Sequence, residues 1–484
     1  MQLDYPFSNH MVLQHHKKIK ITGTSQEQCI SITFLDQEYF TQVNNNHWCI
    51  EMYLENIGGP YVMTIDENGK KTELDDIYIG DVYLAAGQSN MEFKVKQLKE
   101  YKDLELSNKV ICYVNVPQNY YEDQDYIYPG EKQSSWQKIN QQNIGELSAV
   151  AYYFASTLNV DIPIGIISNN KGGTSASCWI NEDDLKQDKV LKKIYYDEYY
   201  DSLQNVSKQQ QKKDYLTYQH KFIQYQMTFS DYTKKHPELK TEDIKEIIGH
   251  TPWPPPKSYL DFLRPCGLYH TMFLKTLHYP ICGILWYQGE EDVKYADFYE
   301  SLLSVLIKNW RRVYQEELPF YIVQLPEFDS PVDKGFSKIR FAQDAVTKKI
   351  NNTYLIVTLG AGNPRNIHPE NKKEVGQRLA NCVMKNHYHQ DVNLSPNIIN
   401  SIINDQYIQF IFDQDLKEKE IELKGINHNH ERIILKASIK KNSILIPRQK
   451  LTQIIYADDN VPQIQITSQY NLPAGPFQID IQQT

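Results

Sequence analysis

The chain has 484 residues, which is too long for one hydrophobic core and indicates two or three domains. Its content of 41% hydrophobic and 23% charged residues is typical of an ordinary soluble globular protein. The net charge of −9 is spread along the chain and argues against a nucleic-acid-binding surface, which would be basic.

No run of residues is apolar for long enough to cross a bilayer, and residues 1–14 show no basic segment followed by an apolar core. The seven cysteines lie far apart and form neither a Cys-x-x-Cys pair nor a zinc-binding spacing. We therefore expect reduced cysteines, no metal or cofactor, no membrane partner and a cytoplasmic location. A secreted mature form would have the same appearance, and the sequence does not predict the oligomeric state.

Residues 1–76 are expected to form a small N-terminal β-sandwich. Short alternating runs at 18–22, 29–34, 48–54 and 61–65 are separated by turn signals rich in Gly and Asn. Regular spacing of this kind is typical of the strands of a sandwich. The segment carries no cluster of catalytic residue types.

Residues 77–390 alternate between buried-strand and helix patterns. Expected strands lie at 77–86, 164–168, 281–287, 320–325 and 354–359, and apolar residues follow helical spacing at 147–158, 302–310 and 375–383. A repeated strand–helix order predicts an α/β domain built on a doubly wound parallel sheet, with helices on both faces.

Two further segments differ from this pattern. Residues 183–256 are rich in Lys, Gln, Asp and Tyr, and they predict a helical insertion within the central domain. Its charges form a solvated helix face by default, although the insertion could also wall one side of a substrate cleft. Residues 391–484 return to alternation, as at 407–412, and predict a C-terminal β-sandwich-like unit.

The first segment that suggests chemistry is Gly87-Gln88-Ser89-Asn90, directly after the strand expected at 77–86. The carboxyl ends of strands are where an open α/β sheet binds ligands. If a helix begins at Ser89, the backbone N–H of Ser89 lies at a helix N-terminus, which attracts negative charge. A serine hydroxyl beside such an N–H is half of an acyl-transfer site, whereas a simple helix cap is the alternative.

Two later segments also follow expected strands. Gly172 and Gly173 allow the backbone to approach a ligand closely, so the N–H of either glycine is a candidate oxyanion donor; a plain turn is the alternative. Gln288 precedes Glu290-Glu291-Asp292 at the end of another strand. The Gln288 amide can donate to an oxyanion, while the three carboxylates could simply favour a helix dipole.

His368 lies in a loop rich in Gly, Asn and Pro, after the strand expected at 354–359 and before a helix. A histidine in such a loop can act as the base for a serine. Together, the segments place a hydroxyl, N–H donors, an amide, carboxylates and an imidazole along one edge of one sheet. That set is what acyl transfer through an acyl-enzyme requires.

At these segments the chain resembles the SGNH hydrolases, and within them the sialate O-acetylesterase-like carbohydrate esterases. The matching blocks are Gly-Gln-Ser-Asn-Met-Glu at 87–92, Gly-Gly-Thr at 172–174, Trp-Tyr-Gln-Gly-Glu at 286–290 and Ile-His-Pro at 367–369. Met-Val-Leu-Gln at 11–14 and Asn-Leu-Pro-Ala-Gly-Pro-Phe at 471–477 look like the family's flanking β domains. The resemblance implies an SGNH-type fold and a metal-independent serine esterase that removes O-acetyl groups from carbohydrates.

By this resemblance Ser89 is the nucleophile and His368 the general base. The N–H groups of Ser89 and Gly173 would form the oxyanion hole, with Gln288 as the candidate third donor. The residues expected to bind the substrate are the pair Arg340 and Gln343, of which Arg340 could contact a carboxylate, and Trp286. Trp286 could stack on a sugar face, as could Trp179, Trp253 and Tyr287, and packing in the core is the alternative for these rings.

The sequence departs from the family pattern at the acid of the triad. Asn366 stands two residues before His368, where this branch often carries an aspartate. Glu290 is our first choice for the group that orients His368. The alternatives are Asp292 and a Ser–His dyad assisted by a backbone carbonyl.

The expected substrate is an acetylated carbohydrate, with O-acetylated sialic acid first. Acetylxylan or another acetylated glycan fits the same residues. A protein of another class, a catalytically impaired carbohydrate-binding relative, is the remaining alternative, because loss of a triad acid costs about 10⁴-fold in rate.

Overall fold

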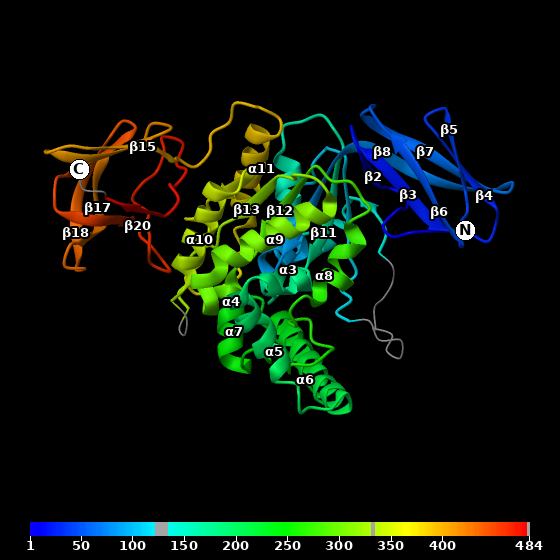
Figure 1. Ribbon diagram of the computed structural model, residues 1–484, viewed down its shortest axis with the longest axis horizontal. Coiled ribbons are helices and arrows are strands. Elements are labelled where there is room, and N and C mark those ends of the chain that lie inside the picture. Colours follow the sequence, from blue (N-terminus) through cyan, green and yellow to red (C-terminus); the bar gives the residue numbers. More distant parts are fainter. Residues whose placement is uncertain (122–133, 331–333, 482–484) are drawn as a thin grey trace.

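The computed structural model describes residues 1–121, 134–330 and 334–481. Figure 1 shows an N-terminal β region (blue), a central α/β region and a C-terminal β region (orange to red) in a row. A mixed α/β architecture with a largely parallel central sheet is therefore confirmed. The predicted C-terminal unit extends to residue 484, and its last three residues lie outside the described ranges.

The N-terminal region consists of two mainly antiparallel β layers with a common core, and the short strand β2 (Val12–Gln14) pairs parallel with Tyr78–Gly80. One sheet has the order β1 (Gln2–Leu3), β3 (Lys18–Thr24), β6 (His47–Tyr53). The other pairs β5 (Gln37–Gln42) with β4 (Cys29–Phe34), β4 with β7 (Gly58–Glu67), and β7 with the start of β8 (Lys70–Gly87). In β6 every second residue is buried, because successive side chains of a strand point to opposite faces.

The strand β8 belongs to two regions at once. Its first part pairs antiparallel with β7, and the part from Asp81 onwards pairs parallel with strands of the central sheet. The boundary predicted at 76/77 therefore falls inside a continuous strand. A register shift near Asp76, which has φ of 57°, marks the place, and such bulges bend a strand without ending it.

The central sheet has β8 in its middle. Its order is β10 (Gln137–Lys138), β9 (Ile111–Asn115), β11 (Ile164–Asn170), β8, β12 (Gly283–Tyr287), β13 (Phe320–Val323), β14 (Thr353–Ile356), and every neighbouring pair except β10–β9 is parallel. The chain fills one side of β8 first and then crosses to the other. The carboxyl end of β8 is thus a topological switch point, where such sheets bind ligands.

Helices cover both faces of this sheet. Leu84 packs in the core shared with α9 (Tyr299–Tyr314) and α10 (Phe336–Lys349), while the next residue, Ala85, packs in the core shared with α2 (Ala149–Thr157) and α11 (Lys372–Asn386). The small helix α8 (Gly267–Thr271) joins the first of these cores. The helix α10 and the strand β9 are additions to the elements expected from the sequence.

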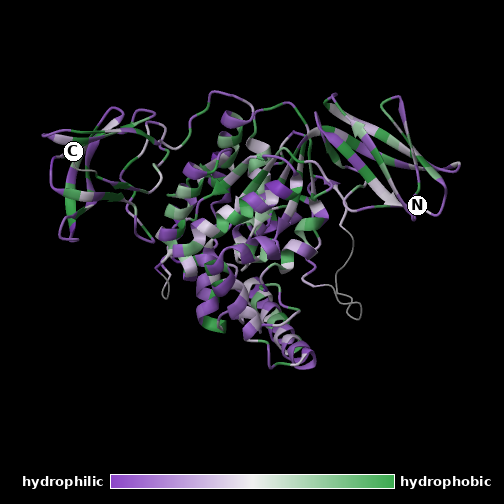
Figure 2. Cartoon of the chain, in the orientation of Figure 1, coloured by the Kyte–Doolittle hydropathy of each residue, from purple (hydrophilic) through white to green (hydrophobic). Residues whose placement is uncertain are grey.

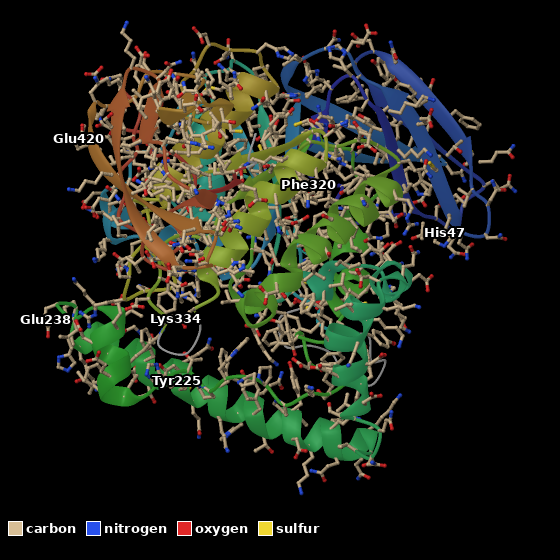
Figure 3. The ribbon with its side chains drawn as sticks, turned by 60° about the vertical axis from the view of Figure 1, so that its left-hand side comes forward. His47, Tyr225, Glu238, Phe320, Lys334 and Glu420 are labelled. Atoms are coloured by element: carbon tan, nitrogen blue, oxygen red, sulfur yellow. The ribbon has the colours of Figure 1, made fainter. Side chains whose placement is uncertain are left out.

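The predicted insertion is helical. It comprises α3 (Glu182–Gln187), α4 (Lys189–Leu191), a π-helical turn (Lys192–Asp197), α5 (Glu198–Asp201), α6 (Lys208–Lys235) and α7 (Thr241–Ile248). Figure 2 shows the insertion as largely hydrophilic, in contrast to the strands of the central sheet. Figure 3 shows α6, labelled at Tyr225, as a long helix set apart from the strand that carries Phe320. No helix among the described residues has both the length and the apolar character needed to cross a membrane.

The C-terminal region differs from the expected sandwich-like unit. It is one seven-stranded sheet with the order β15 (Ile398–Ile403), β16 (Tyr407–Phe412), β19 (Ser443–Pro447), β18 (Arg432–Lys440), β17 (Lys419–Asn427), β20 (Leu451–Tyr456), β21 (Phe477–Asp480). The hydrogen bonds run without a break from β15 to β21, so the strands curve into a half-barrel around their own core instead of forming two facing sheets.

A buried carboxylate on β8 ties three distant segments together. Asp81 is 1% exposed, and hydrogen bonds and ion pairs reach it from Gln14, His15, His387 and Tyr388. Burial opposes the ionisation of Asp81, but these contacts outweigh it and hold the pKa of the carboxyl well below its usual value. The strand that leads to Ser89 is therefore anchored to the N-terminal segment and to the residues that follow α11.

We expect Asp81→Asn to lower the free energy of unfolding by about 3 to 5 kcal/mol at pH 7, as when one partner of a buried ion pair is removed. Because the folded-state pKa is depressed, this stabilisation is fully present above the unfolded-state pKa of about 4 and is lost progressively as the pH falls from there toward the folded-state pKa. Urea unfolding followed by tryptophan fluorescence at pH 7 and pH 3 measures both effects. The exposed Asp75→Asn variant on the same strand is the control. Equal stability of the two variants at pH 7 would contradict the assignment.

Candidate active site

The turn after β8 presents Ser89 at the carboxyl edge of the sheet. Gly87 has φ of 138°, and a Cβ at this position would lie 2.1 Å from the carbonyl oxygen of Tyr287 in the neighbouring β12. Only glycine fits there, because the strands approach so closely. The helix α1 (Ser89–Glu92) begins immediately afterwards, so the N–H of Ser89 lies in a first helical turn.

The structure brings Ser89 and His368 into direct contact. The Oγ of Ser89 lies 2.7 Å from Nε2 of His368, although the two residues are 279 positions apart in the chain. His368 stands in the loop between β14 and α11, as the sequence indicated. A hydroxyl within hydrogen-bonding distance of an imidazole nitrogen is the geometry of an activated nucleophile.

The surroundings of His368 keep its imidazole neutral. Desolvation lowers the pKa of His368 to about 3, and the positive charges of Lys372 and Lys245 act in the same direction. Burial also lowers the pKa of Lys372, to about 7. A neutral imidazole has a free lone pair, so His368 can accept the proton of Ser89 over a wide pH range.

The orienting acid expected beside His368 is not in contact with it. Within residues 1–121, 134–330 and 334–481, no carboxylate is hydrogen-bonded to His368. The Oε1 of Glu290 accepts instead from Nδ2 of Asn90, at 2.5 Å. The side chain of Asn366 accepts from the backbone N–H of His368 at 2.9 Å and so braces the loop. The structure thus corrects the expected role of Glu290, which reaches the loop only through Asn90.

Asn90 links the segments that carry Ser89 and His368. It follows Ser89 in the chain, and its Nδ2 donates to the carbonyl oxygen of Ile367 at 3.0 Å, next to His368. Its Oδ1 accepts from Nζ of Lys372 at 2.5 Å. Asn90 and Lys372 are fully buried. Glu290, the third member of this group, is buried as well, and burial raises the pKa of its carboxyl. No role for Asn90 or Lys372 was predicted from the sequence, because only their convergence in space reveals one.

Two backbone N–H groups remain as oxyanion donors. Among the described residues, no hydrogen bond engages the N–H of Ser89 or of Gly173. The N–H of Gly172 is different, since it donates to Oε2 of Glu92 at 2.5 Å. A Cβ on Gly172 would lie 3.3 Å from Cβ of Ser89, so this turn is next to the nucleophile. Both glycines follow β11, as expected.

Gln288 does not have a free amide hydrogen for an oxyanion. Its Nε2 donates to the carbonyl oxygen of Thr174 at 3.0 Å and to Oδ2 of Asp292 at 2.6 Å. Its Oε1 accepts from the hydroxyl of Tyr299 at 2.9 Å. The expected third donor is therefore a structural residue that fixes the turn after β11. Asp292, an alternative acid, is engaged in the same buried network, where its Oδ1 accepts from Ser175 at 2.6 Å.

Of the residues expected to bind substrate, Trp286, Arg340 and Gln343 are fully buried. Trp286 packs edge-on against Trp310 in the core, at 5.4 Å between ring centroids. Arg340 donates to the backbone carbonyl oxygens of Asp459 and Asn460 and so attaches α10 to the C-terminal region. Gln343 accepts from the N–H of Leu325 and donates to the carbonyl oxygen of Gln288. The expected substrate contacts are therefore replaced by structural roles.

One group of side chains in the described residues has the composition of a metal site. The ligand atoms of Asp81, Cys282 and His387 lie within 4.8 Å of one another. Asp81 is already satisfied by hydrogen bonds, and the thiol of Cys282 donates to the carbonyl oxygen of Val82. Asp81 faces Ile164, the first residue of β11, whereas Ser89 follows the opposite end of this pairing. The group is therefore separate from the Ser89–His368 pair.

Comparison with known proteins agrees with the resemblance. Residues 258–385 match the profile of the family described as carbohydrate esterase, sialic acid-specific acetylesterase. The chain is 24% identical over 389 residues to the sialate O-acetylesterase of Pongo abelii and 25% identical over 377 residues to that of Mus musculus. These alignments cover 72% and 69% of this chain but 62% of each relative. A solved carbohydrate acetylesterase from Xanthomonas citri has the same fold, with a TM-score of 0.77, 21% identity and 99% coverage of both chains.

We expect His368 to stay neutral at pH 5, where an unperturbed histidine is mostly protonated. The pH titration of the imidazole, measured by NMR on histidine-labelled protein and assigned with His368→Gln, tests this. In Lys372→Met the pKa of His368 should rise because one neighbouring positive charge is gone, while burial still holds it below 6.5. An imidazole that titrates near pH 6.5 in the unaltered protein would contradict the neutral state.

Proposed function

We propose that this chain, a member of the sialic acid-specific acetylesterase family of carbohydrate esterases, is a serine esterase that removes O-acetyl groups from sugars. The observation that carries the proposal is the 2.7 Å contact between Ser89 Oγ and His368 Nε2, beside the N–H groups of Ser89 and Gly173. This set matches what acyl transfer needs: a nucleophile, a base and oxyanion donors. We take the central sheet to be of the SGNH type.

The reaction proceeds in two halves. Ser89 Oγ attacks the acetyl carbonyl carbon while Nε2 of His368 takes the hydroxyl proton, and the N–H groups of Ser89 and Gly173 stabilise the oxyanion. The tetrahedral intermediate expels the sugar oxygen, which receives the proton from His368. Water, deprotonated by His368, then attacks the acetyl-Ser89 ester, and acetate leaves as Ser89 recovers its proton.

The base is held by its loop instead of by a carboxylate on its ring. Asn90 fixes the carbonyl of Ile367, and Asn366 fixes the N–H of His368, so both polar groups of the peptide that joins Ile367 to His368 are anchored. Glu290 and Lys372 in turn fix the amide of Asn90. In this arrangement Glu290 is a positioning residue, and Ser89 with His368 forms a dyad.

O-acetylated sialic acid is the first candidate substrate, because the relatives are named sialate O-acetylesterases. Acetylxylan or another acetylated glycan is the alternative substrate. The burial of Arg340 favours this alternative, because the guanidinium is not available to contact the carboxylate of a sialic acid. Initial rates on O-acetylated sialic acid and on acetylxylan rank the two. A binding protein with impaired catalysis is the third candidate, because no carboxylate in the described part of the chain is hydrogen-bonded to His368.

Ser89→Ala should lower kcat for acetate release by about 10⁴-fold or more, as expected when an activated serine is removed. Acetate released from p-nitrophenyl acetate and from an O-acetylated sialic acid is the measurement, with His368→Ala run in parallel. The two variants should lose activity to a similar degree, because they act as one unit. If the unaltered protein is as slow as Ser89→Ala on every ester, the impaired-relative alternative replaces the esterase.

Glu290→Gln distinguishes a positioning residue from a triad acid. Glutamine keeps an oxygen that can accept from Asn90, so we expect less than about a tenfold fall in kcat, whereas losing a triad acid costs about 10⁴-fold. Asn90→Ala removes the bridge itself and should cost more than Glu290→Gln. The nearby Asn371→Ala, which affects only the N-cap of α11, is the matched control. A loss near 10⁴-fold in Glu290→Gln would restore Glu290 as the acid.

A further inference from the structure

The insertion ends in an aromatic side chain that packing does not explain. Trp253 follows α7 and is 47% exposed, whereas the other five tryptophans are at most 3% exposed. An indole is a large apolar surface, and leaving half of it in water is unfavourable unless it contacts something else. Trp253 is one of four aromatic residues that the sequence offered for stacking on a sugar, and the other three, Trp179, Trp286 and Tyr287, are fully buried.

Trp253 lies directly on the candidate oxyanion hole. A Cβ built on Gly173 would be 2.2 Å from Cη2 of the indole, so the ring edge is in contact with this glycine. Gly173 has φ of 75°, which also disfavours any other residue. The preceding residue, Gly172, is adjacent to Ser89. The exposed indole is therefore next to the place where the acetyl carbonyl would bind.

The insertion holds the segment that carries Trp253. Two tyrosines of α6 hold this segment. The hydroxyl of Tyr218 donates to the carbonyl oxygen of Pro252 at 3.1 Å, and the hydroxyl of Tyr225 donates to the carbonyl oxygen of Gly249 at 2.9 Å. The ring of Phe262 supports the indole at 6.1 Å between centroids. Thus α6 fixes the backbone before Trp253, and an aromatic ring supports its side chain.

The same insertion also contacts the loop of the base. Arg365, three residues before His368, lies 3.6 Å from Asp243 and 3.7 Å from Glu246 on α7. The insertion therefore contacts the oxyanion turn through Trp253 and the histidine loop through α7.

We propose that Trp253 is the platform on which the sugar ring of the substrate stacks while its acetyl group lies at Ser89. The ligand class is an acetylated pyranose, whose apolar C–H face complements an exposed indole. The inference rests on the proposed function and adds to it the residue that recognises the sugar. It also gives the helical insertion a role, namely to hold the platform against Gly173.

Tryptophan fluorescence reports on this residue without any turnover. In Ser89→Ala, which does not release acetate, acrylamide quenching should act mainly on Trp253, the one well-exposed tryptophan. Saturation with an O-acetylated methyl xyloside or with O-acetylated N-acetylneuraminic acid should protect Trp253 from quenching. The double variant Ser89→Ala/Trp253→Phe should show no protection. Quenching that is unchanged by either sugar at saturation, or protection that survives in the double variant, overturns the platform.

Kinetics supply a second, selective readout. In Trp253→Ala the ratio of kcat/KM for the acetylated sugar to kcat/KM for p-nitrophenyl acetate should fall about tenfold, with most of the change in KM. Trp253→Phe keeps a ring and should recover part of the ratio. Phe40→Ala, which removes an exposed ring of β5 in the N-terminal region, should leave the ratio unchanged.

The outcomes separate the platform from the proposed function. If Ser89-dependent hydrolysis of acetylated sugars is present but Trp253→Ala lowers both rates equally, Trp253 only packs on Gly173 and the platform is wrong. If no acetylated sugar is hydrolysed but sugars still protect Trp253 from quenching, the platform stands on a non-catalytic binding protein. If neither hydrolysis nor protection occurs, both proposals fail.

Discussion

The amide of Asn90 is the contact on which the candidate site depends. It belongs to the residue after Ser89, and it holds the carbonyl of the residue before His368. The nucleophile and the base come from opposite ends of the central region, so some group must fix their separation. A buried amide suits this task because its two N–H donors and its oxygen are all used, by Glu290, Ile367 and Lys372. The other carboxylate oxygen of Glu290, Oε2, is buried without a hydrogen-bond partner among the described residues, so only the amide of Asn90 is fully satisfied.

Desolvation explains why this network can serve a base without an acid on its ring. Burial raises the pKa of Glu290 and lowers that of Lys372 and of His368, so each group is biased toward its neutral form. In the proposed reaction the neutral imidazole then starts as the proton acceptor. Its protonated form, which an aspartate stabilises in a full triad, has no carboxylate partner among the described residues. The dyad therefore relies on loop geometry to orient the ring.

Several polar residues near the site serve the fold and leave the chemistry to others. Gln288, Gln343 and Arg340 are all fully buried, and each fixes backbone groups of a neighbouring segment. Because these residues stand in motifs that resemble those of the family, we expected them to contact the substrate. A sequence motif does not distinguish a residue that binds substrate from one that stabilises the fold. The hydrogen bonds of Gln288 distinguish the two roles. Both of its amide hydrogens are engaged within the protein, so none is left to donate to an oxyanion.

The sequence by itself determined the parallel sheet, the helical insertion, and Ser89, Gly173 and His368 as candidates, because strand periodicity and Gly-rich turns are local signals. It could not determine that Gly87 lies against Tyr287, that Asn90 joins the two reacting residues, or that Trp253 covers Gly173. These contacts join segments far apart in the chain, and burial and hydrogen-bond satisfaction exist only once the segments have packed. Only the tertiary structure therefore decided which polar groups remain free to meet a substrate.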